Sequence, residues 1–415
     1  MPAIDRLHPD QAIERLLGLE DNRHTEILAL DQAVGRIVAE TIQASLPVPP
    51  FDKSPYDGYA FRGEDTQGAS SNQPVSLDVI GEIAAGQLAN YELQPGQAVK
   101  ILTGGPVPAT ANVCYKFEKT RRQGDQVLIY EPVAPHKDII PAGEDIQAGD
   151  LLVQEGDPLT VGRLGVLASQ GYREVKVYRK PVVGLFSTGD ELVPTGQALP
   201  AGKIYETTRL SLGAILTNLG FEVKDYGIVA DDLEAISRRT GQVISQVDLL
   251  ITTGGASVGD YDYAYSAIES LGGQILFWKT AMKPGGSMLA SRLQNKTVLN
   301  LSGNPAAAIL AFYRVCLPYL YRLTGRKDYY PEKIPMILAH DFNKPSPGVR
   351  LLRGQMQFQE GRLYFQESPA QGNGVLSSFA RCDALLEIPA GSSGVKAGTL
   401  LTGYRCDHLF GPIAR

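Results

Sequence analysis

The sequence predicts a multidomain protein of the α+β and α/β classes: a helical N-terminal domain with an inserted β-rich domain, a three-layer α/β domain and a small C-terminal β-barrel. A chain of 415 residues is long enough for about two to four domains. Between residues 179 and 328, apolar strands alternate with helices, which indicates a mostly parallel sheet. Short strands broken by Gly and Pro fill residues 46–149 and 329–415, as is typical of β-rich domains.

The N-terminal domain is expected from two segments, residues 1–45 and 150–178, that share a helical pattern. Asp10 is a suitable N-cap for a helix that ends at Leu19. A second helix is expected after Asp31, because apolar residues recur near helical spacing up to Ile42. Since residues 46–149 separate the two segments, the β-rich domain is interpreted as an insertion.

The α/β domain is expected over residues 179–328 and the barrel over 329–415. Continuous apolar runs such as 182–186 are typical of strands that are buried on both faces of a sheet. The predicted strands are 182–186, 222–229, 248–253, 274–279 and 297–301, and the predicted helices are 207–219, 232–246, 263–271 and 306–321.

Composition excludes several classes of function. The formal net charge of −6 argues against a protein that binds nucleic acid through its phosphates. No run of 18 apolar residues or secretory signal is present in the sequence, so we expect a cytoplasmic protein without a membrane span. The four cysteines form no CxxC pair, and neither a disulfide framework nor a zinc site is expected.

Each predicted strand of the α/β domain is followed by a polar or glycine-rich segment. In an open α/β sheet, ligands bind beyond the carboxyl ends of the strands, so these segments should meet at one edge. They are Ser187-Thr188-Gly189-Asp190-Glu191, Asp231-Asp232, Gly254-Gly255-Ala256-Ser257-Val258-Gly259-Asp260-Tyr261-Asp262, Lys279 with Lys283-Pro284-Gly285-Gly286-Ser287, and Ser302-Gly303-Asn304-Pro305.

The residue types at this edge suit a phosphorylated organic molecule and a divalent cation. Glycine turns and the helix that begins after Asn304 could present N–H groups to phosphate. Lysines could bind an oxyanion, and carboxylates could hold Mg²⁺. Each segment also has a structural explanation: Asp231-Asp232 as a helix cap, Gly254-Gly255 as a turn, and the lysines as surface residues. Neither a P-loop nor a dinucleotide fingerprint is present in the sequence.

Three further segments lie in the inserted domain: PPFDKSPYDGYA at 49–60, TGGPVP at 103–108 and GEDI at 143–146. Any one of them could be a connector stiffened by proline. In this order, and followed by STGDEL, DD, GGASVGDYDY, KPG and GNP, they resemble the motifs of the molybdopterin molybdenumtransferases, the family that includes the E domain of gephyrin.

The resemblance implies a cytoplasmic homodimer of four-domain subunits that acts in molybdenum cofactor biosynthesis, with other enzymes of that pathway as partners. The substrates would be adenylated molybdopterin and molybdate, and Mg²⁺ would assist the release of AMP. The active site would lie between the α/β domain of one subunit and the inserted domain of the other. The residues implicated as catalytic are Asp57, Thr103, Asp145, Glu191, Asp262, Lys279 and Lys283; as cofactor-binding, Thr188, Gly189, Asp190, Gly254, Gly255, Ser257, Gly303, Asn304, Pro305 and Arg353; and as metal ligands, Asp231 and Asp262.

The chain departs from the family pattern at five positions. A lysine is replaced by Gly286, a proline by Ser302 and a serine by Asn373, all at positions that the family associates with the oxyanion. Tyr56 and Tyr265 stand where a methionine and a lysine are usual. The alternatives are therefore a scaffold protein that retains molybdopterin without inserting metal, and an enzyme for tungstate. If the lost lysine matters, Gly286→Lys should tighten molybdate binding, whereas Asn373→Ser alone should change it little.

Overall fold

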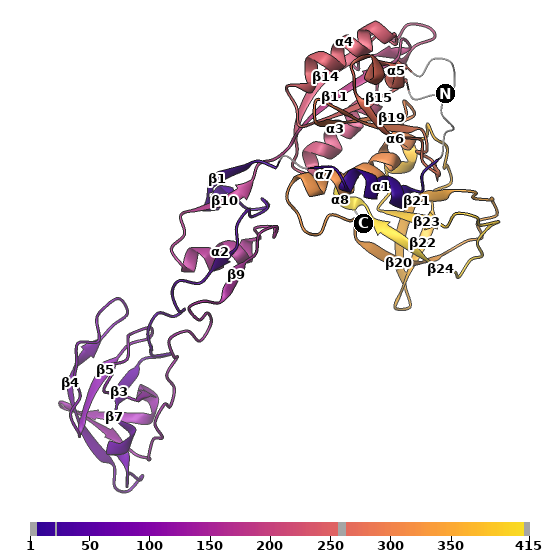
Figure 1. Cartoon of the computed structure of the whole chain (residues 1–415). Coiled ribbons are helices and arrows are strands. Elements are labelled where there is room, and N and C mark those ends of the chain that lie inside the picture. Colours follow the sequence, from indigo (N-terminus) through magenta and orange to yellow (C-terminus); the bar gives the residue numbers. More distant parts are fainter. Residues whose placement is uncertain (1–5, 21–22, 256–262, 411–415) are drawn as a thin grey trace. The chain divides into compact units, whose positions relative to one another are not determined.

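The computed structural model describes residues 6–20, 23–255 and 263–410. The chain forms two compact units, one from residues 1–26 with 178–415 and the other from residues 27–177 (Figure 1). In this division the first 26 residues belong with the C-terminal half of the chain, which contains more than one of the expected domains.

Unit 27–177 contains the expected β-rich domain as a six-stranded sheet. Its order is β6-β3-β5-β4-β8-β7, and every pair is antiparallel except β4 with β5. Apolar side chains such as Phe61 and Ile83 are fully buried on its two faces. The strands are β3 (Gly58–Phe61), β4 (Val75–Ile83), β5 (Gln97–Ile101), β6 (Val113–Lys116), β7 (Thr120–Gln123) and β8 (Gln126–Ile129), with 3-10 turns η2 (Gly63–Thr66) and η3 (Phe117–Lys119).

The flanking segments are less helical than the sequence predicts. The prediction of a helix after Asp31 is wrong. The chain instead forms a 3-10 turn, η1 (Leu30–Gln32), followed by isolated β-bridges from Ile37 to Pro158 and from Val38 to Val177. These apolar residues are buried by pairing with distant strand segments. The elements are β1 (Thr25–Ala29) paired with β10 (Glu174–Tyr178), β2 (Ile42–Gln43) paired with β9 (Leu151–Val153), and α2 (Val161–Ser169).

The second unit contains the α/β domain, whose sheet has the order β14-β11-β15-β19-β18-β16. Four strands are parallel; β18, which the sequence analysis missed, runs antiparallel to both β19 and β16. Consequently β16 runs in the same direction as β19, and five carboxyl ends meet at one edge. The strands are β11 (Val182–Thr188), β14 (Glu222–Val229), β15 (Leu249–Thr253), β16 (Gln274–Trp278), β18 (Met288–Leu293) and β19 (Lys296–Leu301).

Helices cover both faces of this sheet, as three-layer packing requires. Val183 and Leu185 of β11 pack with α3 and α6, whereas Val182 and Phe186 face α4 and α5. The helix from Pro305 to Leu323 is long and apolar enough to cross a membrane, but 83% of its apolar 18-residue window is buried, as in a core helix. The helices are α3 (Thr208–Asn218), α4 (Leu233–Ile244), α5 (Tyr263–Ser270), α6 (Pro305–Ala311), a π-helix (Phe312–Cys316) and α7 (Leu317–Leu323).

The C-terminal residues form the expected small β-barrel. Strands β21-β22-β20-β24-β23 follow one another, and β23 pairs back with β21, which closes the barrel; the short strand β17 (Met282–Lys283) adds to β21 from outside. The barrel strands are β20 (Lys333–Leu338), β21 (Val349–Gln359), β22 (Arg362–Glu367), β23 (Ala384–Ile388) and β24 (Leu400–Arg405), with η5 (Ser377–Phe379) and α8 (Asp407–Phe410) beside them.

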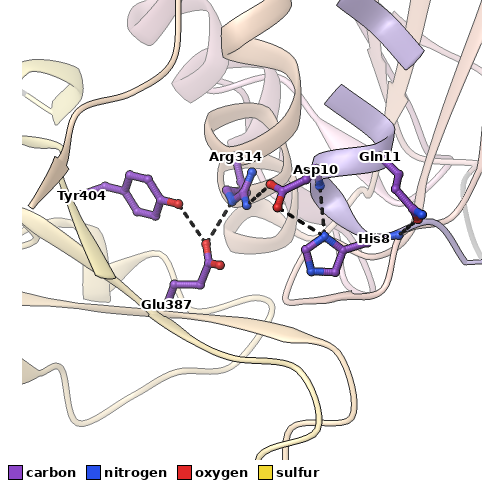
Figure 2. Close-up of polar contacts among 6 residues, drawn as sticks. All are labelled: His8, Asp10, Gln11, Arg314, Glu387 and Tyr404. Atoms are coloured by element: carbon purple, nitrogen blue, oxygen red, sulfur yellow. Dashed lines mark hydrogen bonds and ion pairs between the residues drawn. The ribbon is translucent and has the colours of Figure 1, made fainter. Parts of the chain in front are cut away.

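The first helix, α1 (Pro9–Leu17), is capped by His8 rather than by Asp10, because His8 Nδ1 accepts from Asp10 N. Asp10 instead joins a charge network (Figure 2). Arg314 of the π-helix donates to Asp10 Oδ1 at 2.5 Å and to Glu387 Oε2 of the barrel at 3.0 Å, and Tyr404 also donates to Glu387. The network connects α1, the core helix and the barrel.

Candidate functional site

Two adjoining cavities lie at the carboxyl edge of the α/β sheet. One, of about 450 Å³, has three carboxylates in its lining and is called here the acidic cavity. The other, of about 560 Å³, reaches the barrel and is lined by four basic side chains; it is called here the basic cavity. Ser287, Ser302 and Asn304 line both. A ligand could therefore place one end in each cavity.

Several residues predicted to bind the cofactor do line the acidic cavity. Parallel pairing of β11 with β15 places the turn after Thr188 beside the turn after Thr253. Gly254 has φ +94°, and a Cβ there would lie 2.2 Å from Thr188 O, so only glycine permits this approach. The predicted residues in the lining are Thr188, Gly189, Glu191, Asp231, Gly254, Gly255, Gly303, Asn304 and Pro305.

The two adjacent aspartates after β14 have different roles. Asp232 is the N-cap of α4 and accepts from Ala235 N, so the structural explanation holds for it. Asp231 lines the acidic cavity, and its backbone N–H donates to Asp190 Oδ1. Burial raises the pKa of Asp231, with the nearby carboxylates of Asp190 and Glu191 adding to this and the Thr188 hydroxyl opposing it. A cation would relieve this cost.

Glu206 is a residue of the acidic cavity that the sequence analysis missed. It is 2% exposed, and its Oε1 accepts from Arg209 N and from Ser187 Oγ. Its other oxygen lies 3.5 Å from Arg209 Nε. In the sequence, Glu206 is recognisable only as an acidic residue just before the helix that starts at Thr208. It follows no predicted strand and no glycine turn, so it was not assigned to the site.

The N-terminus of α6 does not present its first N–H groups to a phosphate, contrary to the expectation from Ser302-Gly303-Asn304-Pro305. Ala306 N and Ala307 N both donate to the backbone oxygen of Asn373, at 3.0 and 3.3 Å. The loop from the barrel therefore uses these donors, and it places Asn373 in the lining of the basic cavity.

The basic cavity contains both predicted lysines. Lys279 has φ +71° and is 4% exposed, and its Nζ lies 4.3 Å from the centre of the Trp278 ring, whereas Lys283 is exposed. Arg6 and Arg350 also line the cavity, and neither was predicted from the sequence. Among the described residues of this lining, none is a carboxylate. An anion is the ligand that such a lining favours.

Arg353 was predicted to bind the cofactor, but it lines neither cavity. It is 0% exposed, and its Nη2 donates to Gly372 O and more weakly to Ala370 O. The side chain of Gln371 accepts a hydrogen bond from the backbone N–H of Arg353 and donates one to the backbone oxygen of Arg353. Arg353 thus contacts the loop at 370–372, which leads to Asn373.

The departures from the family pattern gather at the basic cavity, where Gly286, Ser302 and Asn373 are all in the lining. A Cβ on Gly286 would lie 2.6 Å from Met282 O and 2.8 Å from Thr280 O, so the loop accepts only glycine in this conformation. Tyr265 packs at 5.3 Å on Trp278, the ring that Lys279 overlies, and so supports that lysine from outside the cavity.

Asp57, Thr103 and Asp145 belong to the other unit, residues 27–177. Thr103 donates from N and Oγ1 to Asp57 Oδ1, which lowers the pKa of this exposed carboxyl. Asp145 is exposed. Ser257 and Asp262 lie outside the described residues, and within the described ranges no three His, Cys, Asp or Glu side chains are grouped to hold a metal.

Family comparisons cover most of the chain. Residues 7–171 match the MoeA N-terminal region (domain I and II), 184–322 a probable molybdopterin binding domain, and 335–402 the MoeA C-terminal region (domain IV). Two crystal structures of the MoeA molybdopterin biosynthesis protein from Pyrococcus horikoshii are similar, with TM-scores of 0.87 and 0.80 and 30% identity. They cover 99% and 97% of this chain, and 100% of each solved chain is matched.

Curated relatives agree with these matches. A molybdopterin molybdenumtransferase from Staphylococcus epidermidis is 35% identical over 395 residues, covering 94% of this chain and 93% of the relative. One from Staphylococcus aureus is 33% identical over 388 residues, with the same coverage. The chain therefore belongs to the molybdopterin molybdenumtransferase family, the MoeA enzymes of molybdenum cofactor biosynthesis.

Proposed function

We propose that this enzyme inserts molybdenum from molybdate into adenylated molybdopterin and releases AMP. The observation that carries the proposal is the adjoining pair of cavities, one with basic and the other with acidic side chains. The basic cavity suits a tetrahedral oxyanion, since Lys279 and Lys283 supply charge without a carboxylate in the described lining. The acidic cavity suits the phosphates together with a cation.

Mg²⁺ fits the donors of the acidic cavity in part. Asp231 Oδ1 is buried, and it makes no hydrogen bond of normal geometry with another described residue. Hard cations take such oxygens as ligands. We propose Asp231 and Asp262 as metal ligands, with Glu191 close by. When bound, the ion would neutralise charge on the phosphate as the adenylyl bond breaks.

We further propose a cytoplasmic homodimer of four-domain subunits, with domains at 1–45 plus 150–178, 46–149, 179–328 and 329–415. Asp57 and Thr103 are exposed and already hydrogen-bonded to each other, on the unit that carries neither of the two cavities. A twofold axis would let each subunit supply these residues to its partner, and other enzymes of the pathway could deliver the substrate. An active monomer in sedimentation and light scattering would contradict the shared site.

The decisive experiment incubates purified protein with adenylated molybdopterin, Mg²⁺ and molybdate. AMP and mature cofactor should both appear, and Asp262→Ala should lose the Mg²⁺-dependent release of AMP without a change in melting temperature. Binding without AMP release would instead indicate a scaffold protein, and turnover only with tungstate would indicate a different metal specificity.

A further inference from the structure

Cys382 and Cys406 form a pair of thiols in the core of the second unit. Their sulfur atoms lie 3.8 Å apart, and both side chains are 0% exposed. The sequence does not connect them, because they are 24 positions apart and belong to no CxxC pair. Strand pairing joins them: Cys382 lies shortly before β23 and Cys406 directly after β24, the antiparallel neighbour of β23. Across this end of the pair, Cys406 N donates to Asp383 O at 2.9 Å.

The distance between the two sulfur atoms is close to that of a disulfide. An S–S bond is about 2.05 Å long, so each sulfur would move by roughly 1 Å, which rotation of the two side chains can supply. The other cysteines, Cys114 and Cys316, are also free and buried, and burial raises the pKa of both thiols. The geometry therefore singles out one pair among the four cysteines.

Cys382 is the thiol of the pair that ionises first. A hydrogen bond from Cys406 lowers the pKa of Cys382, although burial and the neighbouring Asp383 carboxylate act to raise it. Burial raises the pKa of Cys406, and the charge of Cys382 adds to this effect. The thiolate is the form of cysteine that attacks an oxidant. An oxidant should therefore react at Cys382, with Cys406 as the second thiol.

A buried cation accompanies Cys382. Arg353 is 0% exposed, and its Nε and Nη1 have no hydrogen-bond partner among the described residues. Burial lowers the pKa of Arg353, whereas charge interaction with Cys382 and Glu367 acts to raise it. The guanidinium carbon lies 5.3 Å from the centre of the Phe379 ring, and Cys382 N donates to Phe379 O at 3.1 Å. A nearby guanidinium stabilises the thiolate form of a cysteine.

We propose that Cys382 and Cys406 are a modification site that a peroxide converts into a reversible disulfide. The Cys382 thiolate attacks one oxygen of hydrogen peroxide, the O–O bond breaks, and the departing hydroxide takes up the proton that Cys382 released. Cys406 then attacks the sulfur of the resulting sulfenic acid, the S–S bond forms, the S–O bond breaks and water leaves. The two thiols lose two electrons and two protons, and the peroxide is reduced to two molecules of water.

The oxidant reaches this buried pair through α8. Cys406 directly precedes that four-residue helix, and Leu409 N donates to Cys406 O at 3.0 Å. Phe410 packs on Phe379 with ring centres 5.0 Å apart. A helix of about one turn has little stability of its own, so local opening exposes Cys406 at a lower free-energy cost than global unfolding. The disulfide would then link the start of α8 to the start of β23.

The test treats the reduced full-length protein with hydrogen peroxide, removes the excess with catalase and counts thiols after denaturation. The count should fall from four to two, peptide mapping should identify a link between Cys382 and Cys406, and dithiothreitol should restore all four thiols. The oxidised protein should melt about 5–10 °C higher than the reduced one, because the link restricts the unfolded chain. Four remaining thiols, or a link that includes Cys316, would overturn the inference.

Single variants test the order of the two steps. In Cys406→Ser, peroxide should produce a sulfenic acid at Cys382 that dimedone traps, whereas in Cys382→Ser no trapped product is expected under the same conditions. Cys316→Ala is the matched control, because Cys316 is 0% exposed in the same core. It should form the link as wild type does. Trapping at Cys406 alone contradicts the assignment of Cys382 as the attacking thiol, and loss of the link in a folded Cys316→Ala protein contradicts the pairing.

Discussion

Thr103 donates two hydrogen bonds to a single oxygen, Asp57 Oδ1, one from its backbone and one from its hydroxyl, each 2.8 Å long. Both bonds favour the ionised carboxyl and lower its pKa from the ordinary 3.8. The carboxylate is exposed, so its charge and direction are fixed while it stays open to a ligand.

Thr103→Val should therefore raise the pKa of Asp57 only in part, because the backbone bond remains. A lowered pKa in the folded state contributes stability that is present above about pH 4 and is lost as the pH falls through the folded value. The variant should lose less stability than wild type on acidification below pH 4, and at pH 7 Asp57 should stay ionised. NMR titration of the carboxyl checks this, and an unchanged pKa would show that the hydroxyl bond does not form in solution.

Asp231→Asn should keep or raise stability at neutral pH while it reduces Mg²⁺-dependent AMP release. Burial raises the folded pKa of Asp231, so the folded state holds its proton longer, and stability falls as the pH rises from about 4 through that raised value. The neutral side chain of asparagine removes the free-energy cost of burying the Asp231 carboxylate. Thermal melts with and without Mg²⁺ measure it: Mg²⁺ should raise the melting temperature of wild type more than that of the variant.

The matched control is Asp232→Asn, which removes the neighbouring charge and keeps an amide that can cap α4. Its response to Mg²⁺ should resemble that of wild type. If Mg²⁺ raised the melting temperature of both variants equally less than that of wild type, the ion would be attracted by the overall negative charge at this edge of the sheet and would not be bound by Asp231.

Gly286→Lys should weaken molybdate binding, the reverse of the expectation from the family pattern. Its Cβ would meet the backbone oxygens of Met282 and Thr280, so the loop must shift. Overpacking of this kind costs about 1–3 kcal/mol. Gly286→Ala should show the same destabilisation without any added charge, as measured by urea unfolding.

Gly165→Ala is the control for that substitution. Gly165 lies in helix α2 with no atom within 4 Å of an added Cβ, so alanine should stabilise by about 0.5–1 kcal/mol. If Gly286→Lys instead binds molybdate more tightly with full stability, the loop adopts another conformation, and the expectation from the family pattern is restored.

Arg314→Met should destabilise the protein by about 3–5 kcal/mol, because it leaves Glu387 without its charge partner inside the unit. Arg314 is only 6% exposed and donates a hydrogen bond to Asp10, so its loss also removes the contact that links α1 to the barrel. The double variant Arg314→Met with Glu387→Gln should recover part of the loss. Chemical denaturation of the four proteins tests this, and strict additivity would mean that the two residues do not interact.

Acidification should weaken the same network. Burial opposes ionisation of Asp10, but its hydrogen bond and ion pair with Arg314 prevail, and its pKa is lowered. The stability that Asp10 contributes is present above about pH 4 and is lost as the pH falls through the lowered value. Asp10→Asn should be less stable than wild type at pH 7 and nearly equal to it at pH 2, as measured by thermal melts.

Local sequence was sufficient for the parallel strands of the α/β sheet and for the edge at which they end, although it missed the antiparallel strand β18. The apolar run of β11 and the helix cap at Asp232 were predicted because each depends on neighbours in sequence. The order of polar segments after parallel strands then placed Glu191, Asp231 and Lys279 at one edge, since parallel strands end together.

Strand pairing between residues far apart in the chain determined the features that local sequence did not predict. Ile37 and Val38 suit one face of a helix, yet they bridge Pro158 and Val177, partners that no local window contains. The basic residues of the barrel depend on pairing in the same way: the register of β17 with β21 brings Arg350 to the cavity, while Arg353, three residues later, is buried under the loop at 370–372. The motifs therefore determined which chemistry the protein carries, whereas strand register and loop packing, which join residues far apart in the chain, decided which side chains reach the ligand.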